Sequence, residues 1–173
     1  WSLGGLVALE CAKRFPQKVS SVGLVASSPK FLADQHWSGI QPVVLEGFAA
    51  SLQTDHEKTV AQFLKIQAMG SPHLKQDIKR LKERLMSLPS PKIQALSEGL
   101  MLLKTIDLRS DLRTINRPIK AIFGQLDSLV PVQTATNVMD LHSGIDVTVL
   151  KKCSHAPFIS NPDEFLQWMV KSF

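Results

Sequence analysis

The chain has 173 residues, 44% of them hydrophobic, so it is long and apolar enough for one globular domain with or without a small insertion. No apolar run reaches the length of a membrane span, and we expect no membrane partner. The net charge is +5, and the excess is concentrated in one segment, 75–84.

This basic segment carries five cationic side chains against Asp77 and Glu83, namely Lys75, Lys79, Arg80, Lys82 and Arg84. Nucleic acid is one interpretation, but neither a nucleic-acid motif nor an aromatic platform accompanies it, so we expect no nucleic acid. An acidic protein partner is a second interpretation. An ordinary solvated helix face is the third.

The two cysteines lie far apart, and their surroundings lack metal-ligand spacing. We therefore expect no metal and no other cofactor. Cys11 falls among Ala8, Leu9 and Ala12 of a predicted helix, which favours a buried free thiol. Reduced cysteines fit a cytoplasmic protein.

The first residues, Trp1-Ser2-Leu3-Gly4-Gly5-Leu6, match the second half of a Gly-x-Ser-x-Gly nucleophile elbow. In that motif a strand turns sharply into a helix with the serine at the apex, and glycines let strand and helix approach closely. The Leu3 N–H would be one donor to an oxyanion. The alternative is a helix-capping serine followed by small residues. The match also predicts a fragment whose leading strand and second oxyanion donor lie upstream.

The predicted elements alternate as in an α/β protein, then change to helices only, then alternate again. A helix over 3–15 and a strand over 19–26 come first. Helical periodicity then covers 42–54, 57–69, 73–88 and 91–104, with proline-containing breaks between the later helices. A strand at 118–124, a helix at 130–141 and a strand at 146–150 follow. This order predicts an α/β fold in which a four-helix cap, 40–110, is inserted between core segments 1–39 and 111–173.

The last predicted helix has a clear start, with Asn161 as N-cap, Pro162 at the first helical position and Glu164 three residues after the cap. Its buried face is expected to carry four large side chains, Phe165, Trp168, Met169 and Phe173.

An acid and a base follow two of the predicted strands. Asp127 comes just after strand 118–124, and His155 comes just after strand 146–150. Carboxyl ends of parallel strands are where α/β folds place their sites. Asp107 and Asp111 lie in a polar connection that favours a structural role. The order Ser2, Asp127, His155 therefore predicts a triad, with His155 as base and Asp127 holding its imidazole.

Two helices of the predicted cap have faces whose side chains suggest a function. Val60, Phe63 and Gln67 share one side of helix 57–69, which suits a fatty chain with a polar end, although Phe63 as cap core is the alternative. On helix 73–88 a buried stripe is predicted at Leu74, Ile78, Leu81 and Leu85. A basic stripe lies about 100° further round, at Lys75, Lys79 and Lys82, with Lys58 adding to it from the preceding helix.

The motifs at 1–6, 25–29, 103–109, 126–131 and 154–160 together resemble those of α/β-hydrolases. The cap sequence at 63–70 resembles more closely the biotin-pathway carboxylesterases that act on pimeloyl-[acyl-carrier protein] methyl ester. The resemblance implies the α/β-hydrolase fold and hydrolysis to pimeloyl-[acyl-carrier protein] and methanol. It implies substrate contacts from Ser2, Leu3 and His155, and from an acyl channel lined by Phe63, Leu64, Lys65, Ile66 and Gln67.

An acidic acyl carrier protein is the implied partner, docked on the basic stripe of Lys58, Lys75, Lys79 and Lys82, and the enzyme is expected to be a monomer. Two alternatives stay open. One is a general short-chain carboxylesterase or lactonase with the same triad. The other is an inactive fragment or binding module.

Overall fold

The computed structural model describes residues 1–173, except for the side chain of Met86, and these residues form a three-stranded parallel sheet. The strands lie in the order β1 (Val22–Val25), β2 (Ile119–Gly124) and β3 (Ile145–Leu150). Val25 pairs with Ile122 in one ladder, and Ile119 pairs with Ile145 in the other. Because β2 has a neighbour on each side, nearly all its side chains are buried, as its apolar sequence predicts.

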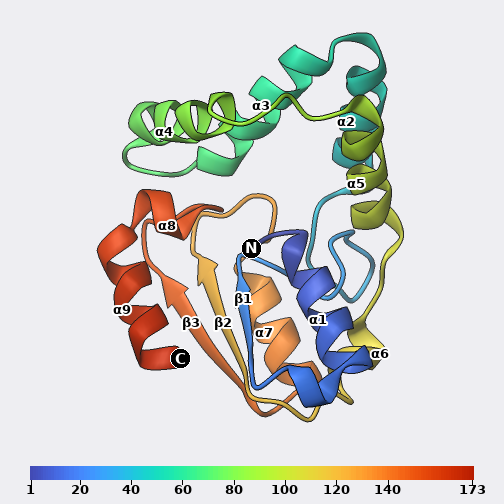
Figure 1. Cartoon of the computed structure of the whole chain (residues 1–173), viewed down its shortest axis with the longest axis vertical. Helices are drawn as coiled ribbons and strands as arrows, with labels where there is room; N and C mark the ends of the chain where they lie inside the picture. Colours follow the sequence, from blue (N-terminus) through green and yellow to red (C-terminus); the bar gives the residue numbers. More distant parts are fainter.

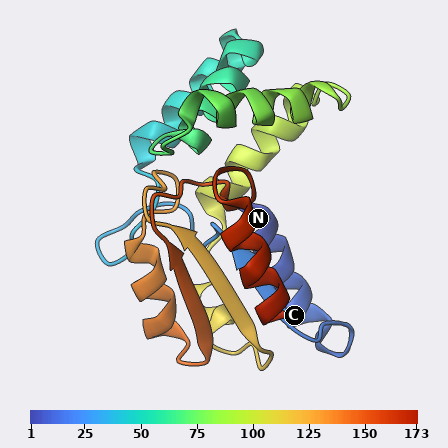
Figure 2. The same cartoon turned by 90° about the vertical axis from the view of Figure 1, so that its left-hand side faces the viewer.

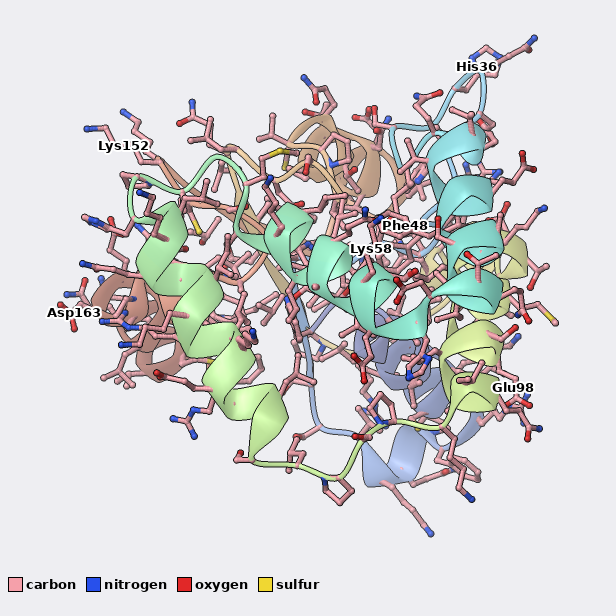
Figure 3. The ribbon with its side chains drawn as sticks, turned by 90° about the horizontal axis from the view of Figure 1, so that it is seen from above. His36, Phe48, Lys58, Glu98, Lys152 and Asp163 are labelled. Atoms are coloured by element: carbon pink, nitrogen blue, oxygen red, sulfur yellow. The ribbon has the colours of Figure 1, made fainter. Side chains whose placement is uncertain are left out.

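Helices surround this sheet and also form a layer above it (Figure 1). Those of the sheet layer are α1 (Gly4–Arg14), the short 3₁₀ helix η1 (Pro16–Lys18), α6 (Arg109–Leu112), α7 (Gln133–Leu141), α8 (Pro157–Ser160) and α9 (Pro162–Ser172). Those of the upper layer are α2 (Pro42–Thr54), α3 (His56–Ala68), α4 (Leu74–Met86) and α5 (Ile93–Thr105). Seen from above, α3 crosses between α2 and α4 (Figure 3).

The two faces of the sheet are covered by different helices. Leu9 of α1 and Val138 of α7 belong to the large cluster on one face. Trp168 of α9 packs with Ile122 on the other. Figure 2 shows α7 and α9 on opposite sides of the strands. Among the described residues, no helix combines the length and the apolar character needed to cross a bilayer.

The predicted elements are all present, most of them with bounds that differ by one to three residues. The first strand starts at Val22 rather than 19, because η1 and two serines precede it. The helix predicted over 130–141 starts at Gln133, because the backbone N–H groups of Leu129 and Val130 donate to the side chain of Asp127 in the preceding loop. Helix 73–88 begins and ends inside its predicted bounds, as α4.

Four burial predictions were wrong, at Cys11, Leu85, Met169 and Phe173. Cys11 is free but exposed, because it lies on the outer side of α1, whereas Leu9 and Ala12 face the core. Met169 is exposed, because α9 buries only the strip around Trp168. Leu85 is 36% exposed, because the last turn of α4 extends past the cluster that buries Leu81.

The last helix starts as predicted but is capped differently. Asn161 is the N-cap of α9, yet its side chain makes no hydrogen bond to the first helical N–H groups. Its amide donates instead to the Glu164 carboxylate. Phe173 is 58% exposed, although its ring packs edge-on against Trp168.

A charged cluster ties together the chain segments that enter and leave the upper helices. Lys30 and Arg109 both contact Asp34 and Asp107, and the Arg109 guanidinium lies 5.3 Å from the ring centre of Trp37. The backbone of Leu108 also donates to Pro29. The hydrogen bond from Lys30, with a second from the His36 N–H, lowers the pKa of Asp34 from 3.8 to about 2.

This cluster predicts a pH-dependent contribution to stability. Because the folded state depresses the pKa of Asp34, its contribution is present above pH 4 and is lost as the pH falls toward 2. Asp34→Asn should lower the free energy of unfolding at pH 6 by about 1 kcal/mol or less, since the cluster is exposed. Urea unfolding at pH 6 and pH 3 measures it, and the difference from wild type should shrink at pH 3. Asp140→Asn is the control, and an equal loss there, or a pH-independent loss at Asp34, would contradict the assignment.

Candidate active site

Ser2 occupies a strained turn between the sheet and α1. Its φ is +50°, in the left-handed region that residues with a side chain rarely adopt. The Ser2 N–H donates to the Val25 carbonyl at 3.0 Å, and the Ser2 carbonyl accepts from the Ser27 hydroxyl at 2.7 Å. These bonds hold the strained backbone in place, so that the hydroxyl of Ser2 projects from the turn. This is the geometry that the opening motif predicts.

The close approach expected at the glycines is found at Gly5. A Cβ built on Gly5 would lie 2.0 Å from the hydroxyl oxygen of Ser27, which is fully buried. At Gly4 a built Cβ meets no heavy atom of the described residues within 4 Å. The crowding predicted for both glycines is therefore found at Gly5 and not at Gly4. The crowded contact is that of helix α1 with Ser27, which directly follows β1.

Asp127 lies in the loop that follows β2. One carboxylate oxygen accepts the backbone N–H groups of Leu129 at 2.8 Å and Val130 at 2.9 Å. The side chain is completely buried. These two bonds fix the carboxylate so that its second oxygen points toward the loop after β3.

His155 lies in that loop and joins the other two residues. Its Nδ1 is 2.8 Å from the second carboxylate oxygen of Asp127, and its Nε2 is 2.9 Å from the Ser2 hydroxyl. A carboxylate only accepts hydrogen bonds, so Nδ1 carries the proton and Nε2 accepts the proton of Ser2. Sequence reasoning placed these three residues at one edge of the sheet, and the structure brings them into a single hydrogen-bonded chain.

Trp1 supports the histidine, a role that sequence reasoning missed. Its indole N–H donates to the His155 carbonyl at 2.7 Å, and its ring packs edge-on against Phe158 at 5.1 Å. The signal available in the sequence was only the position of Trp1 beside Ser2.

The first turn of α1 leaves one N–H free for a ligand. The hydrogen bonds of this turn use the N–H groups of Ser2, Gly4 and Gly5. Within the described part of the chain, the Leu3 N–H has no partner. Leu3 is therefore placed as an oxyanion donor should be, at a helix N-terminus beside Ser2.

The five predicted channel residues of α3 lie on more than one side of the helix. Phe63 and Ile66 are partly buried against the main core, and Phe63 packs edge-on against Phe48 at 5.5 Å. Leu64 is buried in a second cluster, with Val60 packed against it, so Val60 and Phe63 do not share one face in the packing. Lys65 is exposed.

Gln67 is the polar member of this set and is 6% exposed. Its side-chain carbonyl oxygen finds no hydrogen-bond donor among the described residues. A buried amide oxygen without a donor lowers the stability of the folded state.

A metal site and a thiol nucleophile are two other possibilities for this region. Across the described residues, no group of three or more His, Cys, Asp or Glu side chains has the arrangement of a metal site. Cys153 lies next to the histidine loop, but burial raises the pKa of its thiol to about 11. A thiol that stays protonated is a poor nucleophile, so Cys153 is a weaker candidate for that role than Ser2.

The fold and this strand-end constellation define the α/β-hydrolase class, and the chain belongs to that family: the alpha/beta hydrolase fold matches residues 1–162. An Aliivibrio fischeri protein named Pimeloyl-[acyl-carrier protein] methyl ester esterase is 46% identical over 166 residues, 96% of this chain and 65% of that protein. A Shewanella woodyi protein of the same name is 46% identical over 177 residues, 99% of this chain and 69% of that protein. The chain thus spans about two thirds of the length of these relatives.

Solved structures show the same fold at lower identity. An esterase from Exiguobacterium antarcticum superposes with a TM-score of 0.86 at 19% identity, covering 99% of this chain and 63% of that one. An enol-lactonase from Burkholderia xenovorans gives a TM-score of 0.82 at 18% identity, covering 98% of this chain and 62% of that one. These likenesses confirm the predicted α/β-hydrolase fold.

Proposed function

We propose that this chain carries the catalytic triad of a serine carboxylesterase, with Ser2 as nucleophile, His155 as base and Asp127 as the orienting acid. The observation that supports it is the continuous chain of hydrogen bonds from Ser2 through His155 to Asp127. The strained backbone of Ser2 supports it independently, because such strain is characteristic of nucleophile elbows.

The reaction follows from the geometry. His155 Nε2 takes the Ser2 proton as Ser2 attacks the carbonyl carbon of the ester. The Leu3 N–H stabilises the negative charge that develops on the carbonyl oxygen. Protonated His155 then gives its proton to the departing alcohol, which leaves an acyl-Ser2 ester. Water, activated by the same imidazole, releases the acid and restores Ser2. Asp127 keeps the proton on Nδ1 throughout and stabilises the imidazolium.

We propose further that the substrate is the methyl ester of pimeloyl-[acyl-carrier protein], cleaved to pimeloyl-[acyl-carrier protein] and methanol. The names and 46% identity of the relatives support this. The cap, residues 40–110, would cover the acyl chain with Phe63, Leu64, Lys65, Ile66 and Gln67. Both cysteines are free, which fits a reducing compartment such as the cytoplasm. We propose further that the enzyme acts as a monomer and without a cofactor.

One experiment tests both levels of this proposal. Hydrolysis of a carrier-linked pimeloyl methyl ester is compared with hydrolysis of a free short-chain methyl ester, and the protein is treated with a fluorophosphonate. We expect labelling at Ser2 and a clear preference for the carrier-linked ester. Equal rates on both esters would favour a general carboxylesterase, whereas a folded protein without labelling would contradict the triad.

The carrier protein would dock on the outer side of α4. Lys75, Lys79 and Lys82 are all exposed there, and Lys58 is exposed on α3 (Figure 3). Lys79 has one ion-pair partner, Glu83, at 3.8 Å, and both side chains are largely exposed. Such a weak surface pair is easily exchanged for a stronger partner, so the lysines can meet an acidic surface together.

Reversing Lys75, Lys79 and Lys82 to Glu should lower kcat/KM for the carrier-linked ester by roughly 10- to 100-fold at low salt, the scale of electrostatic steering. The defect should shrink as ionic strength rises, because salt screens exposed charges. Hydrolysis of a p-nitrophenyl short-chain ester should be nearly unchanged, since none of the three lysines belongs to the triad.

The matched control reverses Lys18, Arg113 and Lys171, which are equally exposed but lie on η1, after α6 and on α9, at the far end of the sheet (Figure 1). It should leave both substrates unaffected. If both substrates lost activity together in the α4 variant, the lysines would be structural. If neither did, α4 would present an ordinary solvated face.

A further inference from the structure

The end of α3 is hydrogen-bonded directly to the loop that carries His155. The hydroxyl of Ser154 contacts two carbonyl oxygens there, that of Met69 at 2.7 Å and that of Gln67 at 3.0 Å. The N–H of His155 donates to the same Gln67 carbonyl at 3.2 Å. Ser154 is 1% exposed, so water does not compete for these bonds.

The same end of α3 also lies against the loop that carries Asp127. Gly70 has a φ of +93°, and a Cβ built on it would lie 2.8 Å from the Cβ of Leu126. The Leu126 N–H in turn donates to the Cys153 carbonyl at 2.8 Å. The end of α3 and the two triad loops therefore form one packed unit.

The main chain of His155 is held from outside the sheet on both sides. Its N–H is bound by the Gln67 carbonyl of α3, and its carbonyl accepts from the indole of Trp1. The position of the imidazole relative to Ser2 therefore depends on where α3 ends. The gap between the end of α3 and the loop of His155, lined by Gln67, Ser154 and Ala156 among others, has no room for a water molecule. The Ser154 hydroxyl, rather than a water molecule, therefore donates to the carbonyls at the end of α3.

We infer that Ser154 is a positioning residue that couples the cap helix α3 to the catalytic histidine. It holds His155 within reach of Ser2 by its hydrogen bonds to the carbonyls of Gln67 and Met69. A bound acyl chain that holds α3 in one position would therefore also position His155 through the same hydrogen bonds. This inference rests on the proposed ester hydrolysis by Ser2. Small displacements of a catalytic group strongly lower the rate of the chemical step. Loss of the Ser154 hydrogen bonds should therefore lower kcat rather than raise KM.

Ser154→Ala should lower kcat for a p-nitrophenyl short-chain ester by about tenfold, with KM within about twofold of wild type. Ser154→Thr, which keeps a hydroxyl at the same place, should restore kcat to within about threefold. Ser160→Ala is the matched control, because this neighbouring hydroxyl bonds Ala156 and Cys153 but makes no hydrogen bond to α3 among the described residues. It should keep wild-type kcat.

Gly70→Ala tests the linkage from the cap side without altering Ser154, and thermal unfolding shows which variants are folded. The added methyl group should displace the end of α3 from Leu126 and lower kcat in the same way. Wild-type kcat in folded Ser154→Ala or in folded Gly70→Ala, or an equal loss in Ser160→Ala, would overturn the inference while leaving the proposed function intact. A wild-type protein that neither hydrolyses esters nor is labelled at Ser2 would remove the proposed function, and this inference with it.

Discussion

Ser2→Ala is expected to reduce ester hydrolysis by roughly 10⁴- to 10⁶-fold while the protein stays folded, because the members of a catalytic triad act as a unit. Ser2 is only partly buried, and its hydroxyl bonds only His155 in the described structure, so its loss removes little packing. His155→Ala should lose a similar factor. The double variant should be no worse than either single one.

The measurement is kcat/KM on the carrier-linked ester and on a p-nitrophenyl ester, with circular dichroism to verify folding. His56→Ala serves as the control, because His56 is exposed at the start of α3 and lies outside the triad. Near-normal rates in His155→Ala would show that another group is the base. Multiplicative losses in the double variant would show that Ser2 and His155 act separately.

The grouping of the three candidate triad residues could be predicted because its signal is local. Ser2 stands in a recognisable turn motif, and Asp127 and His155 each follow an apolar strand whose direction is set by the α/β order. Parallel strands end at one edge of a sheet, so three local patterns were enough to bring distant side chains together.

The supporting bonds could not be predicted in the same way. Ser154, Trp1 and Ser27 each donate a hydrogen bond to a backbone carbonyl that is 25 or more positions away. Every residue has a carbonyl, so no residue type marks the acceptor. Only the packing of α3 on the loops shows which one is used.

The periodicity of α9 and α4 predicted the buried face correctly at Trp168 and Leu81, but not the extent of that face. Leu85 lies one turn beyond Leu81, past the cluster that buries it, whereas Met169 lies about 100° round the helix from Trp168, outside the narrow buried strip. A period carries no information about how far or how widely the neighbouring element covers a helix.

The second large effect is expected at Gly5, where α1 passes over Ser27. A methyl group there would lie 2.0 Å from the Ser27 hydroxyl oxygen and 2.6 Å from its Cβ. Ser27 cannot turn away easily, because it is fully buried and its hydroxyl holds the Ser2 carbonyl. Relief therefore requires that α1 move away from β1, which takes Ser2 with it.

Gly5→Ala should accordingly lower the free energy of unfolding by about 3 kcal/mol or more, the upper range for overpacked sites, and should also reduce fluorophosphonate labelling of Ser2. Gly47→Ala is the control, because Gly47 is a helical glycine of α2 with no atom of the described residues within 4 Å of a built Cβ. That change should be neutral or stabilise by up to about 1 kcal/mol, since alanine favours helix. Urea unfolding compares the two variants. If Gly5→Ala were as stable as Gly47→Ala and still labelled at the normal rate, the contact between α1 and Ser27 would not be what positions the nucleophile.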